Sequence, residues 1–92
     1  MKESDVWIEF PQEGETIAHA RYTFQVCACA SAMTVEVSVN GGPWLPCRES
    51  MGLWWFDWED CADGEHAAAA RIHKERGQTA ESEPRRFSVK LG

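Results

Sequence analysis

The sequence predicts an all-β domain, a sandwich of about seven antiparallel strands. Polar and apolar residues alternate over several short runs, turn-forming residues separate those runs, and the chain holds five tryptophans in 92 residues. Alternation with a period of two indicates strands that bury one face, because successive side chains of a strand point to opposite sides. Tryptophan supplies a large buried area, which a single domain over residues 1–92 needs for a stable core.

The first half of the chain shows the clearest alternation. It predicts strands at residues 6–10, 22–31 and 34–40. In the last of these, three valines share one face while polar residues occupy the other. Such a pattern is typical of a strand with one face in the core and one in solvent.

A tight hairpin is predicted next, at residues 40–42, because the sequence Asn-Gly-Gly tolerates the positive φ angles of such turns. The hairpin leads into a short returning strand at 44–45. Pro46 ends that strand, since proline lacks the N–H that a sheet requires. Residues 47–52 are then expected to form a loop.

An aromatic-rich strand is predicted at residues 53–60. One face of this strand carries only aromatic residues and is expected to line the core: Trp54, Phe56 and Trp58. The other face carries Trp55, Asp57 and Glu59, so Trp55 is the tryptophan that we expect to be exposed.

Residues 64–76 admit two interpretations. A run of four alanines with acids before it, bases after it and Gly77 at its end favours a helix. Alternation places Ala68, Ala70 and Ile72 on one side together with His66, and this favours a strand. We predict the strand, and an α+β fold is the alternative if residues 64–76 are helical. A polar loop at residues 78–83 and a final strand at residues 87–91 complete the predicted order of elements.

Residues 35–44, VEVSVNGGPW, resemble the immunoglobulin-like (early-set) β-sandwich domains found in many bacterial enzymes and extracellular proteins. Within that group the chain is most similar to the C-terminal dimerisation domain of sulfite-oxidase-type molybdenum enzymes. The resemblance implies an immunoglobulin-like sandwich and a role in dimerisation. It implies no oxidoreductase chemistry, because no molybdenum-binding domain is present. The matching positions are Val35, Val37, Gly41, Gly42, Trp44, residues 53–58, Gly64, His66, Arg71, Gly77 and Gln78.

The chain is acidic, with 15 Asp and Glu against 9 Lys and Arg and a net charge of −6. This balance repels a phosphate backbone, so no nucleic-acid partner is expected. No apolar run is long enough to cross a bilayer, so we expect no membrane segment. The first ten residues, MKESDVWIEF, lack the apolar centre of a signal peptide, which leaves a cytoplasmic protein and a domain cut from a larger secreted protein both open.

Four cysteines leave three possibilities open. Cys27, Cys29, Cys47 and Cys61 are even in number, which is compatible with disulfides, and their spacing does not match a recognised zinc motif. Free thiols are the favoured state, because cysteine often serves as a small buried hydrophobic residue. We expect no metal and no cofactor.

No motif in the sequence predicts catalysis, because no nucleophile elbow or phosphate loop is present. The function predicted is therefore a non-catalytic binding or assembly module that contacts a protein partner or a second copy of itself. The predicted binding residues are Trp55, Asp57, Glu59 and Trp7, because exposed aromatic residues mark interfaces. The alternative is a carbohydrate-binding module that uses the same tryptophans and carboxylates. A plainer interpretation is that Trp7 and Trp44 pack the ends of the core and that Trp55 lies under a neighbouring loop.

Overall fold

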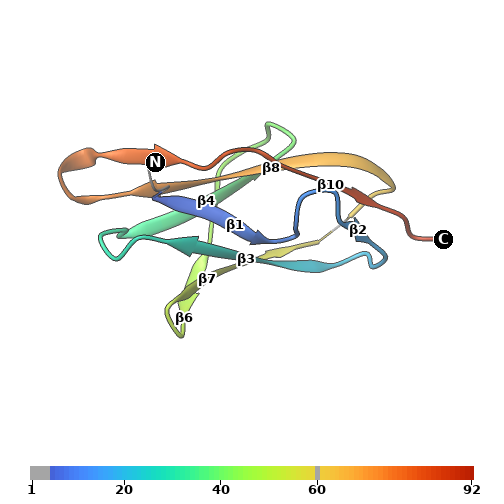
Figure 1. Ribbon diagram of the computed structural model, residues 1–92, viewed down its shortest axis with the longest axis horizontal. Coiled ribbons are helices and arrows are strands. Elements are labelled where there is room, and N and C mark those ends of the chain that lie inside the picture. Colours follow the sequence, from blue (N-terminus) through green and yellow to red (C-terminus); the bar gives the residue numbers. More distant parts are fainter. Residues whose placement is uncertain (1–4, 60) are drawn as a thin grey trace.

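A computed structural model describes residues 5–59 and 61–92 of the chain, which fold into two β-sheets packed face to face (Figure 1). The first sheet has four strands in the order β1-β3-β7-β6, all antiparallel to their neighbours. Its strands are β1 (Val6–Phe10), β3 (Tyr22–Ala28), β6 (Arg48–Ser50) and β7 (Leu53–Trp58).

The second sheet has six strands in the order β2-β10-β8-β4-β5, and β9 also pairs with β8. Only the short β2 runs parallel to its partner, β10; the other pairs of this sheet are antiparallel. Its strands are β2 (Thr16–Ile17), β4 (Thr34–Val39), β5 (Leu45–Pro46), β8 (Gly64–His73), β9 (Thr79–Glu81) and β10 (Arg85–Val89).

The strand order is that of an immunoglobulin-like sandwich. In such folds one sheet holds strands A, B, E and D, and the other holds C, F and G. Here β1, β3, β7 and β6 take the first set of places, while β4, β8 and β10 take the second. The predicted all-β sandwich is therefore confirmed, with short additional strands at its edges.

The core lies between the sheets, and Phe24 on β3 stands at its centre. Phe24 is completely buried and meets four other aromatic rings edge-on, with centroids 5.6–5.9 Å apart. Edge-on contacts are a favoured geometry for aromatic pairs. The buried apolar residues of the core are Val6, Ile8, Ile17, Phe24, Val26, Val35, Val37, Phe56, Cys61, Ala68, Ala70, Ile72, Phe87 and Val89.

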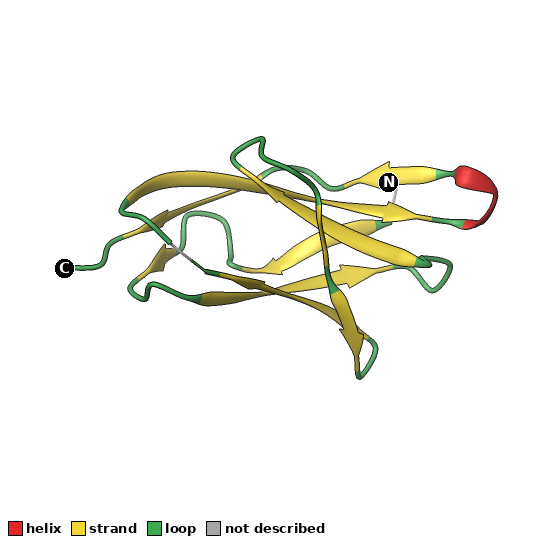
Figure 2. Ribbon diagram, turned by 180° about the vertical axis from the view of Figure 1, so that it is seen from behind, coloured by secondary structure: helices red, strands yellow, loops and turns green. Residues whose placement is uncertain are grey.

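The helical interpretation of residues 64–76 is wrong, because Gly64–His73 forms the longest strand, β8. It pairs with β4 on one side and with β9 and β10 on the other. Ala70 and Ile72 are fully buried on its inner face. Tertiary pairing and burial thus override the helix propensity of the alanine run. The only helical turn among the described residues is η1 (Glu75–Gly77), at the opposite end of the sandwich from the C-terminus (Figure 2).

Two segments predicted to be loops contain strands. Residues 47–52 hold β6, and residues 78–83 hold β9. All three residues of β6 are exposed, so its sequence shows no alternation between buried and exposed positions. Backbone pairing with β7 defines it as a strand, and sequence patterns do not report such pairing.

The predicted hairpin after β4 is confirmed at Asn40 and Gly41, whose φ angles are 55° and 73°. The Gly42 N–H donates to the Val39 carbonyl oxygen at 3.0 Å and closes the turn. Two consecutive residues with positive φ give a turn whose twist matches that of the flanking strands.

Among the residues that the structure describes, none of the helical segments has the length and apolar character of a membrane-spanning helix.

Candidate functional site

Apolar side chains gather on the outer face of the four-stranded sheet, here called the aromatic face. Trp7 is 43% exposed and Phe10 is 38% exposed. In the sheet register, Trp7 on β1 lies opposite Cys27 on β3. Gln25 on β3 lies opposite Phe10 on one side and opposite Trp55 of β7 on the other. The residues that define the aromatic face are Trp7, Phe10, Gln25, Cys27, Leu53 and Trp55.

Trp55 is placed on this face, as its position in the alternation indicates, but it is only half-buried rather than fully exposed. Its indole N–H donates to the Ser50 carbonyl oxygen at 3.2 Å, so the ring lies against the β6–β7 hairpin. Trp7 is the more exposed of the two tryptophans predicted to bind, and it does not pack an end of the core.

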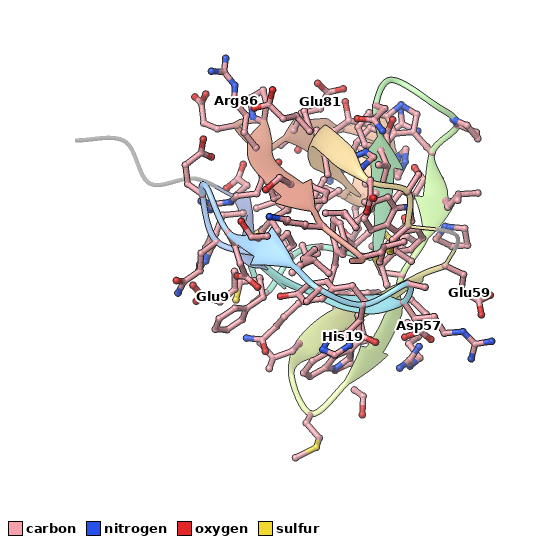
Figure 3. The ribbon with its side chains drawn as sticks, turned by 90° about the vertical axis from the view of Figure 1, so that its right-hand side faces the viewer. Glu9, His19, Asp57, Glu59, Glu81 and Arg86 are labelled. Carbon is pink, nitrogen blue, oxygen red and sulfur yellow. The ribbon has the colours of Figure 1, made fainter. Side chains whose placement is uncertain are left out.

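The carboxylates beside Trp55 are already paired. Asp57 accepts a 2.8 Å hydrogen bond from the Thr23 hydroxyl and forms an ion pair with Arg48. The hydrogen bond from Arg48, followed by that from Thr23, holds the pKa of Asp57 below its ordinary value. Glu59 lies 3.5 Å from the Arg21 guanidinium, and both of these side chains are largely exposed. In Figure 3, Glu9 and Asp57 both lie in the lower half of the view, Glu9 at the left and Asp57 at the right.

A charged network occupies the outer face of the six-stranded sheet. Glu36 Oε1 accepts hydrogen bonds from Arg71 Nη2 at 2.8 Å and Nε at 3.2 Å, and from His73 Nε2 at 2.7 Å. The Arg71 guanidinium carbon stands 4.3 Å from the centroid of the Trp44 ring. These contacts hold Trp44 on the sheet surface, so the interpretation that it packs an end of the core is wrong.

This network makes stability depend on pH. Hydrogen bonds from Arg71, then from His73, lower the pKa of Glu36 from 4.5. A depressed pKa stabilises the fold above the ordinary value, and that contribution is lost as pH falls through the lower folded value. We therefore predict that the stability of Glu36→Gln falls less than that of the native chain as the pH is lowered. Urea midpoints measured at several pH values below about 5 give this comparison.

Glu83→Gln provides the matched control, because the Glu83 side chain forms no hydrogen bond or ion pair with residues 5–59 and 61–92. This variant is expected to keep the acid-side decline of the native chain. A Glu36→Gln profile parallel to the native one would show that the network does not respond to acid.

A shallow groove adjoins Trp44 on the outer face of the six-stranded sheet. Its volume is about 340 Å³. The sequence did not predict this groove, because its lining comes from four separate segments. One feature of the sequence does indicate it: the strand interpretation of residues 64–76 places two small side chains, Ala67 and Ala69, on the outward face of β8. The lining residues are Ser38, Asn40, Gly41, Trp44, Ala67, Ala68, Ala69, Glu81 and Pro84.

The cysteines lie in different surroundings. Cys27, Cys29 and Cys47 carry free thiols. Burial raises the pKa of Cys47 to about 12, with a further contribution from Glu36, so its thiol stays protonated. Cys61 is buried, and its Sγ donates to the Trp58 carbonyl oxygen at 3.8 Å. The described residues contain no cluster of three or more His, Cys, Asp or Glu side chains suited to a metal ion.

Comparisons with known proteins support the fold. Neither a protein-family model nor a curated protein sequence matches the chain. Among solved structures, the endo-β-1,4-mannanase from Thermotoga petrophila superposes with a TM-score of 0.79 at 17% identity, over 100% of this chain. This chain spans only about a fifth of the mannanase, 21% of its length. The fibronectin(III)-like modules of Clostridium thermocellum CbhA also give a TM-score of 0.79, at 20% identity, over 95% of this chain and 97% of theirs.

These identities establish the fold and nothing finer. The broad resemblance to immunoglobulin-like sandwich domains is confirmed at that level. Neither structure is a sulfite-oxidase-type enzyme, so the narrower resemblance gains no support from them. The chain has the two-sheet architecture of immunoglobulin-like and fibronectin(III)-like modules.

Proposed function

We propose that this chain is a non-catalytic accessory module that associates with another protein surface through the aromatic face. The observation that carries the proposal is the exposure of Trp7 and Phe10 beside half-buried Cys27, Leu53 and Trp55. A contiguous apolar patch on a soluble domain marks an interaction site, and tryptophan is enriched where partners bind.

The geometry favours docking onto the sheet face over strand addition at its edge. Arg85 Nη2 donates to the Ile8 carbonyl oxygen at 2.7 Å and thereby occupies an acceptor on β1. The opposite edge strand, β6, has only three residues, all exposed. Short or covered edges discourage pairing with another strand. The outer face of the sheet, where Trp7 and Phe10 are exposed, is therefore the surface that we propose for docking.

An accessory role is supported by the comparisons. Nearly the whole chain superposes on the CbhA fibronectin(III)-like modules, and the mannanase contains the same architecture as a fifth of a longer chain. The partner surface in this proposal is a neighbouring domain of a larger protein or a second copy of this chain. The endo-β-1,4-mannanase also makes a glycoside-degrading enzyme a reasonable host for such a module.

A non-catalytic role is supported by the placement of two of the three histidines, His66 and His73. His66 Nδ1 accepts from the Asn40 amide at 2.8 Å, while its Nε2 donates to the Ala62 carbonyl oxygen at 2.7 Å. His73 is bonded to Glu36. Both side chains therefore serve the fold, and in the described part of the chain neither bonds to a cysteine or hydroxyl that could act as a nucleophile.

Sedimentation velocity over a concentration series tests whether a second copy is the partner. We expect the chain to form dimers as concentration rises and Trp7→Ser to weaken them at least tenfold, because tryptophan anchors contribute about 2 kcal/mol or more. Leu45→Ser is the matched control, since Leu45 is 45% exposed at an edge of the other sheet. Dimers that persist in Trp7→Ser and dissociate in Leu45→Ser would contradict the assignment of the face.

Carbohydrate binding at the aromatic face is the weaker candidate function. It would require Trp55 or Trp7 to stack on a sugar while nearby carboxylates accept hydroxyl hydrogens. Asp57 already accepts from Thr23 and Arg48, and Glu59 lies beside Arg21. A sugar would have to displace these contacts, so we favour association with protein at this face.

A further inference from the structure

The groove beside Trp44 has the size and apolar character of a small-ligand site. Its volume of about 340 Å³ lies within the usual range of roughly 300–1,000 Å³ for such sites. Ala67 and Ala69 form its floor on the central strand β8, where their small side chains leave space. Trp44 and Pro84 come from opposite sides of β8 and border the floor.

Trp44 is held in place before any ligand arrives. The Arg71 guanidinium stacks on its ring at 4.3 Å, and Glu36 holds Arg71 through two hydrogen bonds to one carboxylate oxygen. Arg71 itself does not line the groove. Such fixed aromatic surfaces lose little conformational entropy when a ligand binds, so more of the contact energy appears as affinity.

Glu81 supplies a hydrogen-bond acceptor at the groove. Its exposed carboxylate forms no hydrogen bond or ion pair with the residues that the structure describes. The other polar side chains of the lining are already bonded: the Ser38 hydroxyl donates to the Gly42 carbonyl oxygen, and Asn40 bonds to Ala67 and His66. Figure 3 places Glu81 on the opposite side of the molecule from Glu9 and Asp57, away from the aromatic face.

We propose that this groove binds a sugar ring of a neutral polysaccharide. The C–H face of a pyranose would lie on Trp44 and the alanine floor, while ring hydroxyls donate to the two oxygens of Glu81. Among the residues that the structure describes, no Lys or Arg lines the groove itself, and the chain carries a net charge of −6, which disfavours an anionic ligand on Trp44. A peptide strand finds no free edge at the floor, since β8 is paired on both sides.

An adjoining hollow extends the site along the sheet. It measures about 450 Å³ and shares Asn40 and Ala67 with the groove. Its other lining residues include Glu65, Arg86 and Ser88, which offer both donors and acceptors to hydroxyl groups. Because the hollow and the groove adjoin, an oligosaccharide is a better probe than a single sugar.

The test is isothermal titration calorimetry of the chain with cellohexaose, a neutral β-linked oligosaccharide. We expect saturable binding that Trp44→Ala weakens about tenfold or more, because an aromatic contact and its buried area are lost. Ala69→Leu keeps Trp44 and fills the groove from the outward face of β8, so it should abolish binding while the urea midpoint stays close to that of the native chain. Trp7→Ala, on the aromatic face, should bind as the native chain does.

Three results would overturn the proposal. One is the absence of binding to cellohexaose and to other neutral oligosaccharides at saturating concentration. The second is binding that survives both Trp44→Ala and Ala69→Leu. The third is groove-dependent binding of a proline-rich peptide in place of a sugar. None of these results bears on protein association at the aromatic face, because that surface lies on the other sheet.

Discussion

Replacing Phe24 by alanine should lower the free energy of unfolding by about 3–5 kcal/mol. The Phe24 side chain is completely buried and touches the rings of Tyr22, Phe56, Trp58 and Phe87, which come from both sheets. Its removal forfeits the transfer energy of the ring and leaves a cavity that these neighbours cannot close. Urea unfolding followed by tryptophan fluorescence measures the change.

Phe10→Ala serves as the matched control, because it removes the same side chain from a position that is 38% exposed. We expect a loss of roughly 1 kcal/mol or less, in keeping with surface substitutions. Equal losses for the two variants would show that Phe24 does not organise the contact between the sheets.

Replacing Asn40 by alanine should cost about 2–3 kcal/mol, the sum of a strained turn and lost hydrogen bonds. Asn40 has φ of 55°, where residues with a Cβ are disfavoured. Its Oδ1 accepts from the Ala67 N–H at 3.0 Å, and its Nδ2 donates to His66 Nδ1 at 2.8 Å. The side chain thus joins the β4 hairpin to β8.

Asn40→Gly separates the two contributions. Glycine tolerates the positive φ but removes both side-chain bonds, so we expect a loss about 1 kcal/mol smaller than that of alanine. Thermal unfolding of the three proteins gives the order of stability, with the native chain first, then glycine, then alanine. Alanine and glycine variants of equal stability would mean that the turn conformation is not under strain.

Sequence patterns predict the fold wherever a strand buries one face. Val35 and Val37 in β4 show this clearly, because alternation reports the difference between core and solvent. The edge strand β6 escapes such prediction, since all of its residues are exposed. In β8 the alanine run favours a helix locally, and only the neighbouring strand-like runs indicate the pairing that the structure contains.

The candidate surfaces are less predictable than the fold. Alternation assigns Trp55 and Asp57 to one face, but contacts with Ser50, Arg48 and Thr23 decide what those side chains can still bind. The position of Trp44 in the groove depends on Arg71, which stacks on its ring. Arg71 is itself held by Glu36, 35 positions away in sequence. Such contacts follow from strand register, and register is a property of the folded sheets.

The central claim is that another protein surface covers the aromatic face. Its most direct test is hydroxyl-radical footprinting of Trp7 in an extract of the cells that make the protein. Comparison with the purified chain shows whether another protein surface covers the aromatic face, whichever partner supplies it. Trp7 and Phe10 are exposed in the isolated fold, and a bound partner would cover them. We therefore predict that oxidation of both residues is severalfold lower in the extract than in the purified chain. Equal oxidation of Trp7 in the two samples would contradict a role in protein association.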